Sequence, residues 1–385
     1  MNSTWLAPPS LIFLGIVFLS SCSSAPQVVE QPVAKTVELN QASMTISDNT
    51  GGSFNSTTSR RLNVSIATFS KGILEQTSKR HIYNRVRKAE TNYLPVVLRN
   101  TLLESRHWGA VRVIPEIDPT TEVSVTAEIL ESTAVELSLK VRVVDARGVV
   151  WLDQVYSDVS TDHGYGYGSD YNVSEATSES REPFQDLYND IANDMYLARR
   201  KLGETEVSNI LDMATLRYAI ALSPRAFSEY LEVNEDGSVE MSGLPARNDS
   251  MYSRVKKIRE SEYRFIDIMD EQYDSFFKNM QAVYPYWRQY SYELMVYNRE
   301  LEQAGTERKP RAGNWTVLKN VYHTYQEFKM NEDALRELSS SFESEIKPTE
   351  AELEGQVVKL SGSLQNQYTD WRELLQEIYT LERGN

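Results

Sequence analysis

The feature that most constrains the fold is a helical spacing of apolar residues through the last third of the chain. Between residues 249 and 301, apolar side chains recur mostly three or four positions apart, close to a heptad repeat with one polar step at Glu262. Such spacing places an apolar stripe along a helix, and the stripe must be buried against other helices. Its members are Val255, Ile258, Phe265, Met269, Phe276, Met280, Val283, Trp287, Tyr290, Leu294, Tyr297 and Leu301.

The same spacing resumes twice after short interruptions. Residues 305–313 separate the first stripe from a second over 315–346, and Pro348-Thr349 precedes a third over 353–378. Thr349 and Glu352 have the spacing of a helix capping box, and Pro285 is expected to kink the first helix. Because long helices joined by short loops lie antiparallel, residues 247–385 are predicted to form an all-α helical hairpin or three-helix coiled coil.

Residues 59–203 have a different pattern, typical of a mixed sheet. Amphipathic helices are predicted over 83–108, where Pro95 marks a kink or a start, and over 183–200. The expected order is strand, helix, strand, three strands and a closing helix, so the chain is predicted to be α+β, with an N-terminal α/β sandwich domain ahead of the helical domain. Alternation of apolar and polar residues predicts half-buried strands over 62–69, 110–114, 122–130, 134–144 and 149–156.

Three short patterns in this domain carry a resemblance. They are Val64-Ser65-Ile66-Ala67-Thr68-Phe69, Val123-Ser124-Val125-Thr126-Ala127-Glu128-Ile129, and a strand-Asp-x-x-Gly-strand-Trp pattern that ends at Trp151. Over roughly residues 60–200 the chain resembles the periplasmic α/β domain shared by the curli secretion-channel lipoprotein, the lipoprotein activator of penicillin-binding proteins and the amino-terminal domain of the Tol-system translocation protein. It is also similar to a group of uncharacterised proteobacterial lipoproteins.

The resemblance implies a fold and an envelope location, but not channel formation. A pore-forming relative needs long amphipathic hairpins that alternate apolar and polar residues through the depth of a bilayer. The sizeable insertion in this domain, residues 158–182, is dominated by Ser, Asp, Gly and Glu. Such a loop is too polar to form a membrane wall.

The first residues predict export and lipid anchoring. An apolar run over 11–19 has the length of a signal-peptide core and leads into Leu19-Ser20-Ser21-Cys22. This tetrapeptide resembles the bacterial lipobox at every position, although residues 1–21 contain no Lys or Arg. The resemblance implies a signal peptide over 1–21, recognised by its peptidase at Leu19, Ser20 and Ser21, and a Cys22 that carries a diacylglyceryl group and an N-acyl chain. Several acyl chains hold a protein stably on a membrane, whereas one does not.

The residues behind Cys22 predict where the protein sits and how it is connected. Ser23 and Ser24 follow the cysteine, and the absence of Asp there resembles signals sorted to the Gram-negative outer membrane. Residues 22–58 are rich in Ser, Thr, Gln, Asn, Gly and Pro, which predicts a flexible tether. Residues 204–246 are predicted to be a helical connector. We therefore expect a lipid-anchored protein on the periplasmic face of the outer membrane.

Charge and cysteine content exclude several kinds of chemistry. The net charge of −15 disfavours nucleic acid, whose binding needs a basic surface. With Cys22 acylated, the single cysteine leaves no disulfide, thiol nucleophile or cysteine metal site. No metal site is predicted, and no cofactor other than the covalent lipid, because the histidines lack metal-binding spacing. They are His81, His107, His163 and His323.

No catalytic residue is predicted, but two groups of aromatic residues are candidate partner contacts. Tyr165 and Tyr167 stand in a Gly/Tyr loop, which lacks the context of a phosphate-binding loop. Tyr286 and Trp287 belong to an aromatic-rich part of the first long helix, where the aromatic residues exceed what one helical seam can bury. An aromatic core shared by three helices is the alternative interpretation of this second group.

These observations favour a non-enzymatic docking, scaffold or assembly factor that binds an envelope protein partner. Two alternatives stay open. One is a periplasmic hydrolase or glycan-processing enzyme, with two carboxylates about 5–10 Å apart in a groove between the two halves of the chain. The other is self-assembly of the chain, as a homo-oligomer, into a ring or a trans-envelope tube.

Overall fold

The structure is a computed structural model, and its described residues belong to one compact unit. The predicted fold class is confirmed, because a sheet region with helices is followed by a largely helical region. The described residues are 35–39, 61–72, 84–160, 182–234, 239–246, 248–303, 315–344, 346–353 and 356–381.

The sheet is mixed, and its strand order is β1-β6-β5-β4-β2-β3. β2 runs parallel to β3 and β4, whereas β4, β5 and β6 are successive antiparallel neighbours. β1 adds to the edge of β6 in parallel, so the prediction of an unstructured tether is wrong at these residues. The strands are β1 (Lys35–Leu39), β2 (Val64–Ala67), β3 (Val111–Ile114), β4 (Val123–Ser132), β5 (Glu136–Asp145) and β6 (Val150–Val159).

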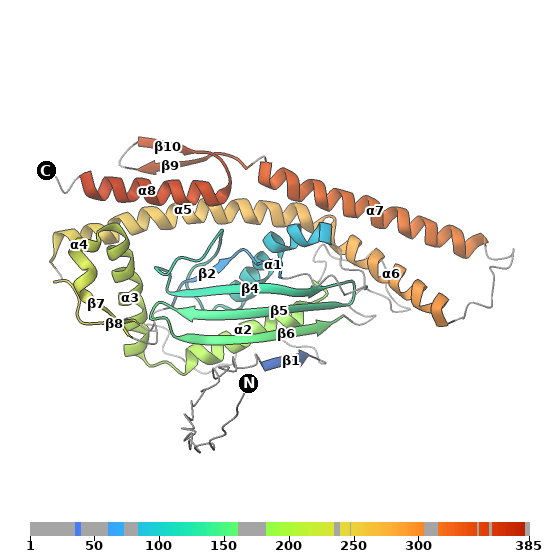
Figure 1. The fold of residues 1–385 in the computed structure, drawn as a ribbon, viewed down its shortest axis with the longest axis horizontal. Helices are drawn as coiled ribbons and strands as arrows, with labels where there is room; N and C mark the ends of the chain where they lie inside the picture. Colours follow the sequence, from blue (N-terminus) through green and yellow to red (C-terminus); the bar gives the residue numbers. More distant parts are fainter. Residues whose placement is uncertain are drawn as a thin grey trace, which may run out of the picture. The chain divides into compact units, whose positions relative to one another are not determined.

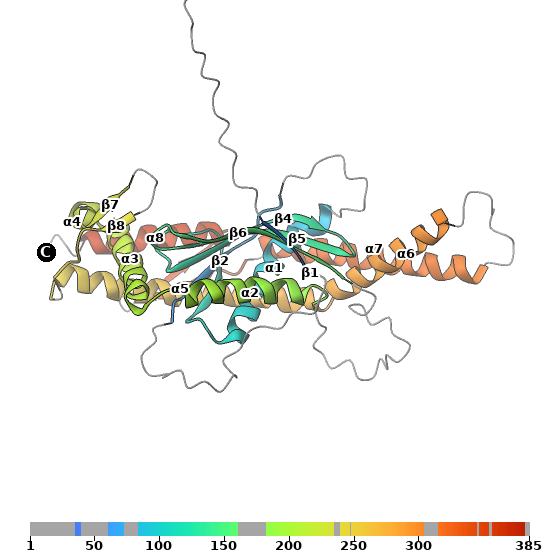
Figure 2. The same ribbon diagram turned by 90° about the horizontal axis from the view of Figure 1, so that it is seen from below.

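Helices α1 (Asn84–Ser105) and α2 (Gln185–Arg200) cover one face of this sheet (Figures 1 and 2). β5 shows why this face is apolar, since Leu139 and Val141 are buried while Lys140 and Arg142, which alternate with them, are exposed. A period of two places alternate side chains on opposite faces of a strand. Pro95 lies inside α1, which continues through it, so it marks no helix start.

The predicted connector contains more structure than short helical pieces. Its main element is α3 (Glu204–Leu222), which packs against both α5 and α8 of the helical region. Pro224 begins the short helix α4 (Pro224–Phe227) after Ser223, and proline is favoured at the first position of a helix. A 3-10 turn (Ser228–Tyr230) then leads into a two-stranded hairpin of β7 (Leu231–Val233) and β8 (Val239–Met241).

The first long apolar stripe forms two helices, α5 (Ser250–Gln281) and α6 (Tyr284–Gln303). The break comes just before Pro285, which lacks the N–H that an uninterrupted helix needs there. α7 (Trp315–Ser344) packs antiparallel to α6, because Trp287 lies against Phe328 whereas Glu293 contacts Thr324. The prediction of an antiparallel helical hairpin is confirmed for this pair.

The third stripe contains a β-hairpin where a helix was predicted. β9 (Thr349–Leu353) and β10 (Gln356–Leu360) pair antiparallel, and α8 (Leu364–Leu381) begins only after them. Thr349, Ala351 and Leu353 are buried while Glu350 and Glu352 are exposed, so β9 has a period of two, and the predicted capping box is wrong. Packing of β9 against α5 outweighs the weak helical spacing of these few residues.

The long helix α5 packs against the edge strand β3, on the side where another strand could otherwise pair. The backbone N–H of Val113 donates to Asp270 Oδ1 at 2.7 Å, and Arg99 of α1 pairs with Asp270 Oδ2 at 2.7 Å. Arg112 Nε pairs with Asp267 Oδ1 at 2.5 Å. An unpaired strand edge invites aggregation, so these carboxylates both hold α5 and protect the sheet. One buried apolar cluster therefore runs from the sheet through α1, α3, α5 and α8.

Candidate functional site

Most of the predicted site residues fall outside the part of the chain that the structure describes. These are the lipid-attachment residue Cys22, the peptidase-recognition residues Leu19, Ser20 and Ser21, and the loop tyrosines Tyr165 and Tyr167. The two remaining candidates, Tyr286 and Trp287, lie in the first turn of α6. Their exposed fractions are 56% and 1%.

Trp287 is a core residue, so the prediction that it contacts a partner is wrong. Its ring stacks on Tyr284 and Phe328 at centroid distances of 5.8 and 6.3 Å, and the guanidinium of Arg288 lies 5.6 Å from its centroid. Trp287 also belongs to the periodic apolar stripe, and that spacing correctly indicated that its side chain is buried. Tyr286, one position earlier, is turned outward by the helical geometry.

The strongest cluster of polar side chains lies where α3, α5, α8 and the loop between β3 and β4 meet. Arg372 of α8 pairs through Nη1 with Asp118 of the loop and through Nε with Glu262 Oε1 of α5, the latter at 3.5 Å. Asp118 is 2% exposed and Glu262 3%. The polar step at Glu262 in the apolar stripe is therefore a buried carboxylate that is paired across the fold.

The loop that carries Asp118 is itself held in place by hydrogen bonds. Asp118 Oδ1 accepts from the backbone N–H of Thr120 at 2.8 Å, which closes a tight turn. Arg259 of α5 donates from Nη2 to the carbonyl of Thr120 at 2.8 Å and from Nη1 to Thr215 Oγ1 of α3 at 2.9 Å. Arg259 thus connects the loop, α5 and α3.

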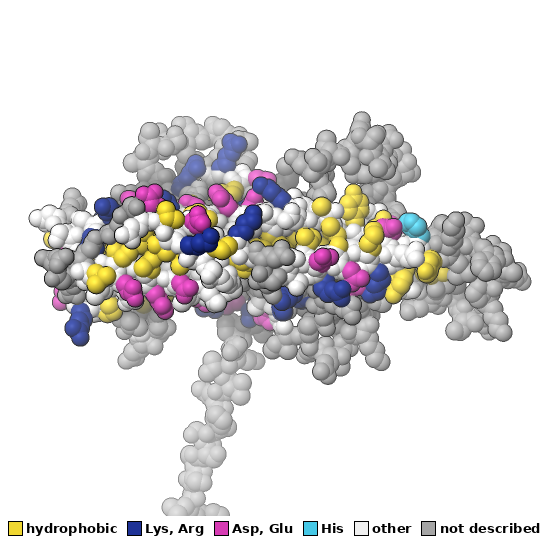
Figure 3. Space-filling model, turned by 90° about the horizontal axis from the view of Figure 1, so that it is seen from above, with side chains coloured by type: hydrophobic (Ala, Val, Ile, Leu, Met, Phe, Trp, Pro, Cys, Tyr) yellow, Lys and Arg dark blue, Asp and Glu magenta, His cyan; other side chains and the backbone are white. Residues whose placement is uncertain are grey.

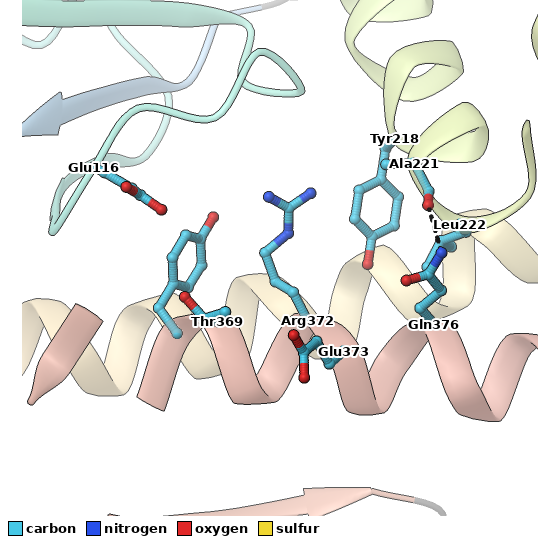
Figure 4. Close-up of a pocket in the computed structure, with 9 residues that line it drawn as sticks. Glu116, Tyr218, Ala221, Leu222, Thr369, Arg372, Glu373 and Gln376 are labelled. Atoms are coloured by element: carbon cyan, nitrogen blue, oxygen red, sulfur yellow. Dashed lines mark hydrogen bonds between the residues drawn. The ribbon is translucent and has the colours of Figure 1, made fainter. Parts of the chain in front are cut away.

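Two tyrosines complete this cluster. Figure 4 shows Arg372 rising from α8 between Glu116 on one side and Tyr218 of α3 on the other. The hydroxyl of Tyr368 donates to Glu262 Oε1 at 3.4 Å, and the Arg372 guanidinium lies 5.8 Å from the centroid of its ring. The guanidinium is therefore oriented by carboxylates and flanked by aromatic rings, which is a favourable setting for a planar cation.

Burial changes the protonation of Glu262. Its pKa is raised from the ordinary value of 4.5 to about 7, because desolvation disfavours the charged carboxylate. The guanidinium of Arg372 opposes this rise, and the charge of Asp118 adds to it. The Glu262 carboxyl therefore titrates near neutral pH.

Two cavities adjoin this cluster, and Arg372 and Ala221 line both of them. The first is about 200 Å³ and includes Glu116, Tyr218, Tyr368 and Gln376 in its wall. The second is about 340 Å³ and lies between α3, the β3–β4 loop and the β7–β8 hairpin. Gln376 closes one side of the first cavity by donating to the carbonyl of Ala221 at 3.3 Å (Figure 4).

The two buried carboxylates of the cluster pair with an arginine and do not face open space together. Asp118 and Glu262 converge, as the enzyme alternative requires, but they converge on the guanidinium of Arg372. Glu262 is not part of either cavity wall. A general acid must reach the proton acceptor on a bound substrate, and Glu262 lines neither cavity. The charged groups in the two walls are Arg217 and Arg372 together with the carboxylates of Glu116, Asp118 and Glu373. No local sequence signal marked Arg372 or Asp118.

A second buried charge cluster joins α1 and α6 and has a structural role. Arg288 is fully buried and pairs through Nη2 with Glu90 Oε1 at 3.1 Å, while Arg87 Nε lies 3.4 Å from Glu90 Oε2. The hydroxyl of Tyr284 also donates to Glu90, at 2.8 Å. Burial raises the pKa of the nearby Glu182 to about 7. Arg87, Glu90, Tyr284 and Arg288 contact one another inside the core, and none of them lines either of the two cavities.

The outer surface of α6 and α7 exposes large apolar side chains, and we call it the α6–α7 surface. It is defined by Tyr286 of α6 and by Tyr322, Tyr325 and Met330 of α7, which are 56%, 62%, 48% and 60% exposed. At about 100° per residue, Tyr325 and Met330 flank Tyr322 on the outward side of α7. Figure 3 shows hydrophobic side chains at the α7 end of this face of the molecule, with charged groups beside them.

The described residues contain neither a metal-binding cluster nor a membrane-spanning helix. Their His, Cys, Asp and Glu side chains form no group of three or more that is arranged to hold a metal ion. Within that part of the chain, no helix is both long and apolar enough to span a bilayer.

A comparison of the chain with models of protein families, with curated proteins and with solved structures found no match.

Proposed function

We propose that this protein is a lipoprotein of the outer membrane, anchored through Cys22 on the periplasmic face, and that it binds an envelope protein without catalysing a reaction. The anchor rests on the lipobox-like Leu19-Ser20-Ser21-Cys22. The observation that carries the binding role is the α6–α7 surface, where three tyrosines and a methionine face outward.

The composition of this surface supports a protein partner. Tyrosine and methionine are enriched at protein interfaces, because each combines a large apolar area with an adaptable or polar tip. A buried tyrosine can act as an anchor that supplies much of the binding free energy. Tyr322 and its neighbours remain about half exposed or more in the isolated chain, so a partner can remove this apolar area from water.

Anchoring and binding act together in this proposal. Acyl chains at Cys22 would confine the body to a thin layer beside the membrane, which raises its effective concentration for partners in the same layer. The body carries most of a net charge of −15, so it gains little attraction from an anionic lipid surface and depends on the acyl chains. The resemblance of residues 60–200 to periplasmic lipoprotein domains agrees with this location.

Site-specific photo-crosslinking in cells tests the binding role. A photoreactive amino acid replaces Tyr322, and a matched probe replaces Glu104, an exposed residue at the end of α1. We expect one discrete crosslinked envelope protein from position 322 and none from position 104. A crosslink between two copies of the chain would favour the self-assembly alternative, and equal, diffuse labelling from both positions would refute the docking surface.

The anchor is tested separately by Cys22→Ala. We expect this variant to leave the membrane fraction and to lose the crosslink at position 322, because its effective concentration near the partner falls. Membrane association equal to that of the unmodified chain would contradict lipid anchoring, whatever the outcome of the crosslinking.

A further inference from the structure

The larger of the two cavities has the composition of a small-molecule site. Its volume of about 340 Å³ lies at the lower end of the range for small-ligand pockets, roughly 300–1,000 Å³. Most of its wall is apolar, and two guanidinium groups and one carboxylate interrupt it. The apolar wall consists of Pro119, Ile220, Ala221, Leu231 and Val239, and the charged groups are Arg217, Arg372 and Asp118.

Arg217 of α3 is the unusual member of this wall. Its Nε is buried and has no hydrogen-bond partner among the described residues, although the residue as a whole is only partly buried. A buried N–H group without an acceptor costs free energy, and a charged group costs more than a neutral one. Burial accordingly lowers the pKa of Arg217, against the opposing effect of Asp145 and Asp118.

The carboxylates near Arg217 are already bonded to other groups. Asp118 pairs with Arg372. Asp145 pairs with Arg147 Nη2 at 2.7 Å and accepts from Trp151 Nε1 at 2.9 Å. Arg217 is therefore the guanidinium of this wall that lacks a bonded anion, and it lies beside an apolar surface.

We propose that this cavity binds a small amphipathic monocarboxylate. Its carboxylate would accept hydrogen bonds from Arg217, and its apolar tail would pack on Ile220, Leu231 and Val239. A guanidinium and a carboxylate match as two parallel hydrogen bonds, which makes this anion the best geometric partner. A doubly charged anion is disfavoured, because Asp118 shares the wall.

The volume limits the length of the tail. At about 30 Å³ for each water-sized group, the cavity holds roughly eleven such groups. A carboxylate with a tail of about seven carbons fills it, so octanoate is a suitable probe. This inference rests on Arg217 and its cavity, not on the α6–α7 surface, so the two proposals can fail separately.

Titration calorimetry of octanoate into the purified full chain tests the proposal. We expect saturable binding at one site, weakened about tenfold or more by Arg217→Met, since a charge-assisted hydrogen-bond pair is lost. The matched control is Arg225→Met, an exposed arginine on the neighbouring helix α4, which should leave the affinity unchanged. Acetate, which lacks the tail, and octanol, which lacks the charge, should each bind about tenfold more weakly or not at all.

Folding of the variants can be checked in the same samples. Arg217→Met should keep or raise the thermal midpoint, because the buried Nε of Arg217 has no hydrogen bond to lose within the described residues. If Arg217→Met does not fold, Arg217→Lys tests the proposal instead, because lysine keeps the positive charge but cannot make two parallel hydrogen bonds to a carboxylate. An octanoate affinity of Arg217→Lys equal to that of the wild type would overturn the proposal. Leu231→Gln should weaken octanoate but not acetate. Equal octanoate binding by the wild type and Arg217→Met, or no binding by the wild type, also overturns it.

Discussion

The buried carboxyl of Glu262 makes stability depend on pH, and Glu262→Gln should remove this dependence. Glu262 is 3% exposed, and burial raises its pKa to about 7, while Arg372 lowers it and Asp118 raises it. A rise from 4.5 to about 7 corresponds to about 3 kcal/mol of difference between the two protonation states. This is a large part of the stability of an ordinary domain.

The sign follows from which state holds the proton more tightly. Between the ordinary pKa of 4.5 and the native value of about 7, the folded chain binds this proton and the unfolded chain has released it. The unfolding free energy therefore falls as pH rises through this window. The contribution of Glu262 is fully present below the ordinary pKa and is lost above the native one.

Urea denaturation at a series of pH values measures the effect. From about pH 5 to about pH 8 the wild type should lose about 2–3 kcal/mol relative to Glu262→Gln, which has no proton to release at this position. The glutamine keeps an acceptor for Tyr368 but loses the ion pair with Arg372, so we expect a constant offset between the two curves. The readout is therefore their change in separation with pH.

A matched control separates this carboxyl from the rest of the chain. Glu260 lies two positions earlier on α5 and is exposed, so Glu260→Gln should follow the wild-type curve at every pH. Curves for the wild type and Glu262→Gln that stay parallel would refute the reasoning, because the carboxyl would then have the same pKa in the folded and unfolded chains.

Three further predictions concern the packing of the helical region. Trp287→Ala should lower the unfolding free energy by about 3–5 kcal/mol, whereas Tyr286→Ala should change it by less than about 0.5 kcal/mol, and equal losses in urea denaturation would contradict the burial difference. Arg288→Met should cost about 3–5 kcal/mol because it removes one of the two guanidinium groups that pair with the buried Glu90, and adding Glu90→Gln should restore part of the loss. Asp270→Ala should speed amide hydrogen exchange in β3, and unchanged protection there would show that α5 does not cover this sheet edge.

Much of the fold could be predicted from local patterns. The alternation over β2 to β6 and the helical spacing of α1, α2, α5, α6 and α7 gave elements of the right type, since these periods report which face of an element is buried. The hairpin β9–β10 and the strand β1 were missed. Both are short, and each depends on a partner far away in the sequence, α5 for β9 and β6 for β1.

The candidate site was harder to predict than the fold. The polar step at Glu262 was visible in the apolar stripe, but its partner Arg372 lies on a different helix, and Asp118, which pairs with the same arginine, lies on a loop. Arg217 likewise resembles any other helical arginine in the sequence. Its lack of a partner becomes meaningful only because the fold places it against an apolar cavity.

By itself, then, the sequence determined the α+β class and the positions of most helices and strands, because these depend on spacing within a short segment. It also carries the lipobox-like Cys22, whose chemistry is local to a tetrapeptide and remains a prediction. The tertiary structure decided which side chain of a neighbouring pair is buried, as with Tyr286 and Trp287, and which charges meet. Burial and ion pairing depend on distances between segments that are far apart along the chain, and only the folded arrangement sets those distances.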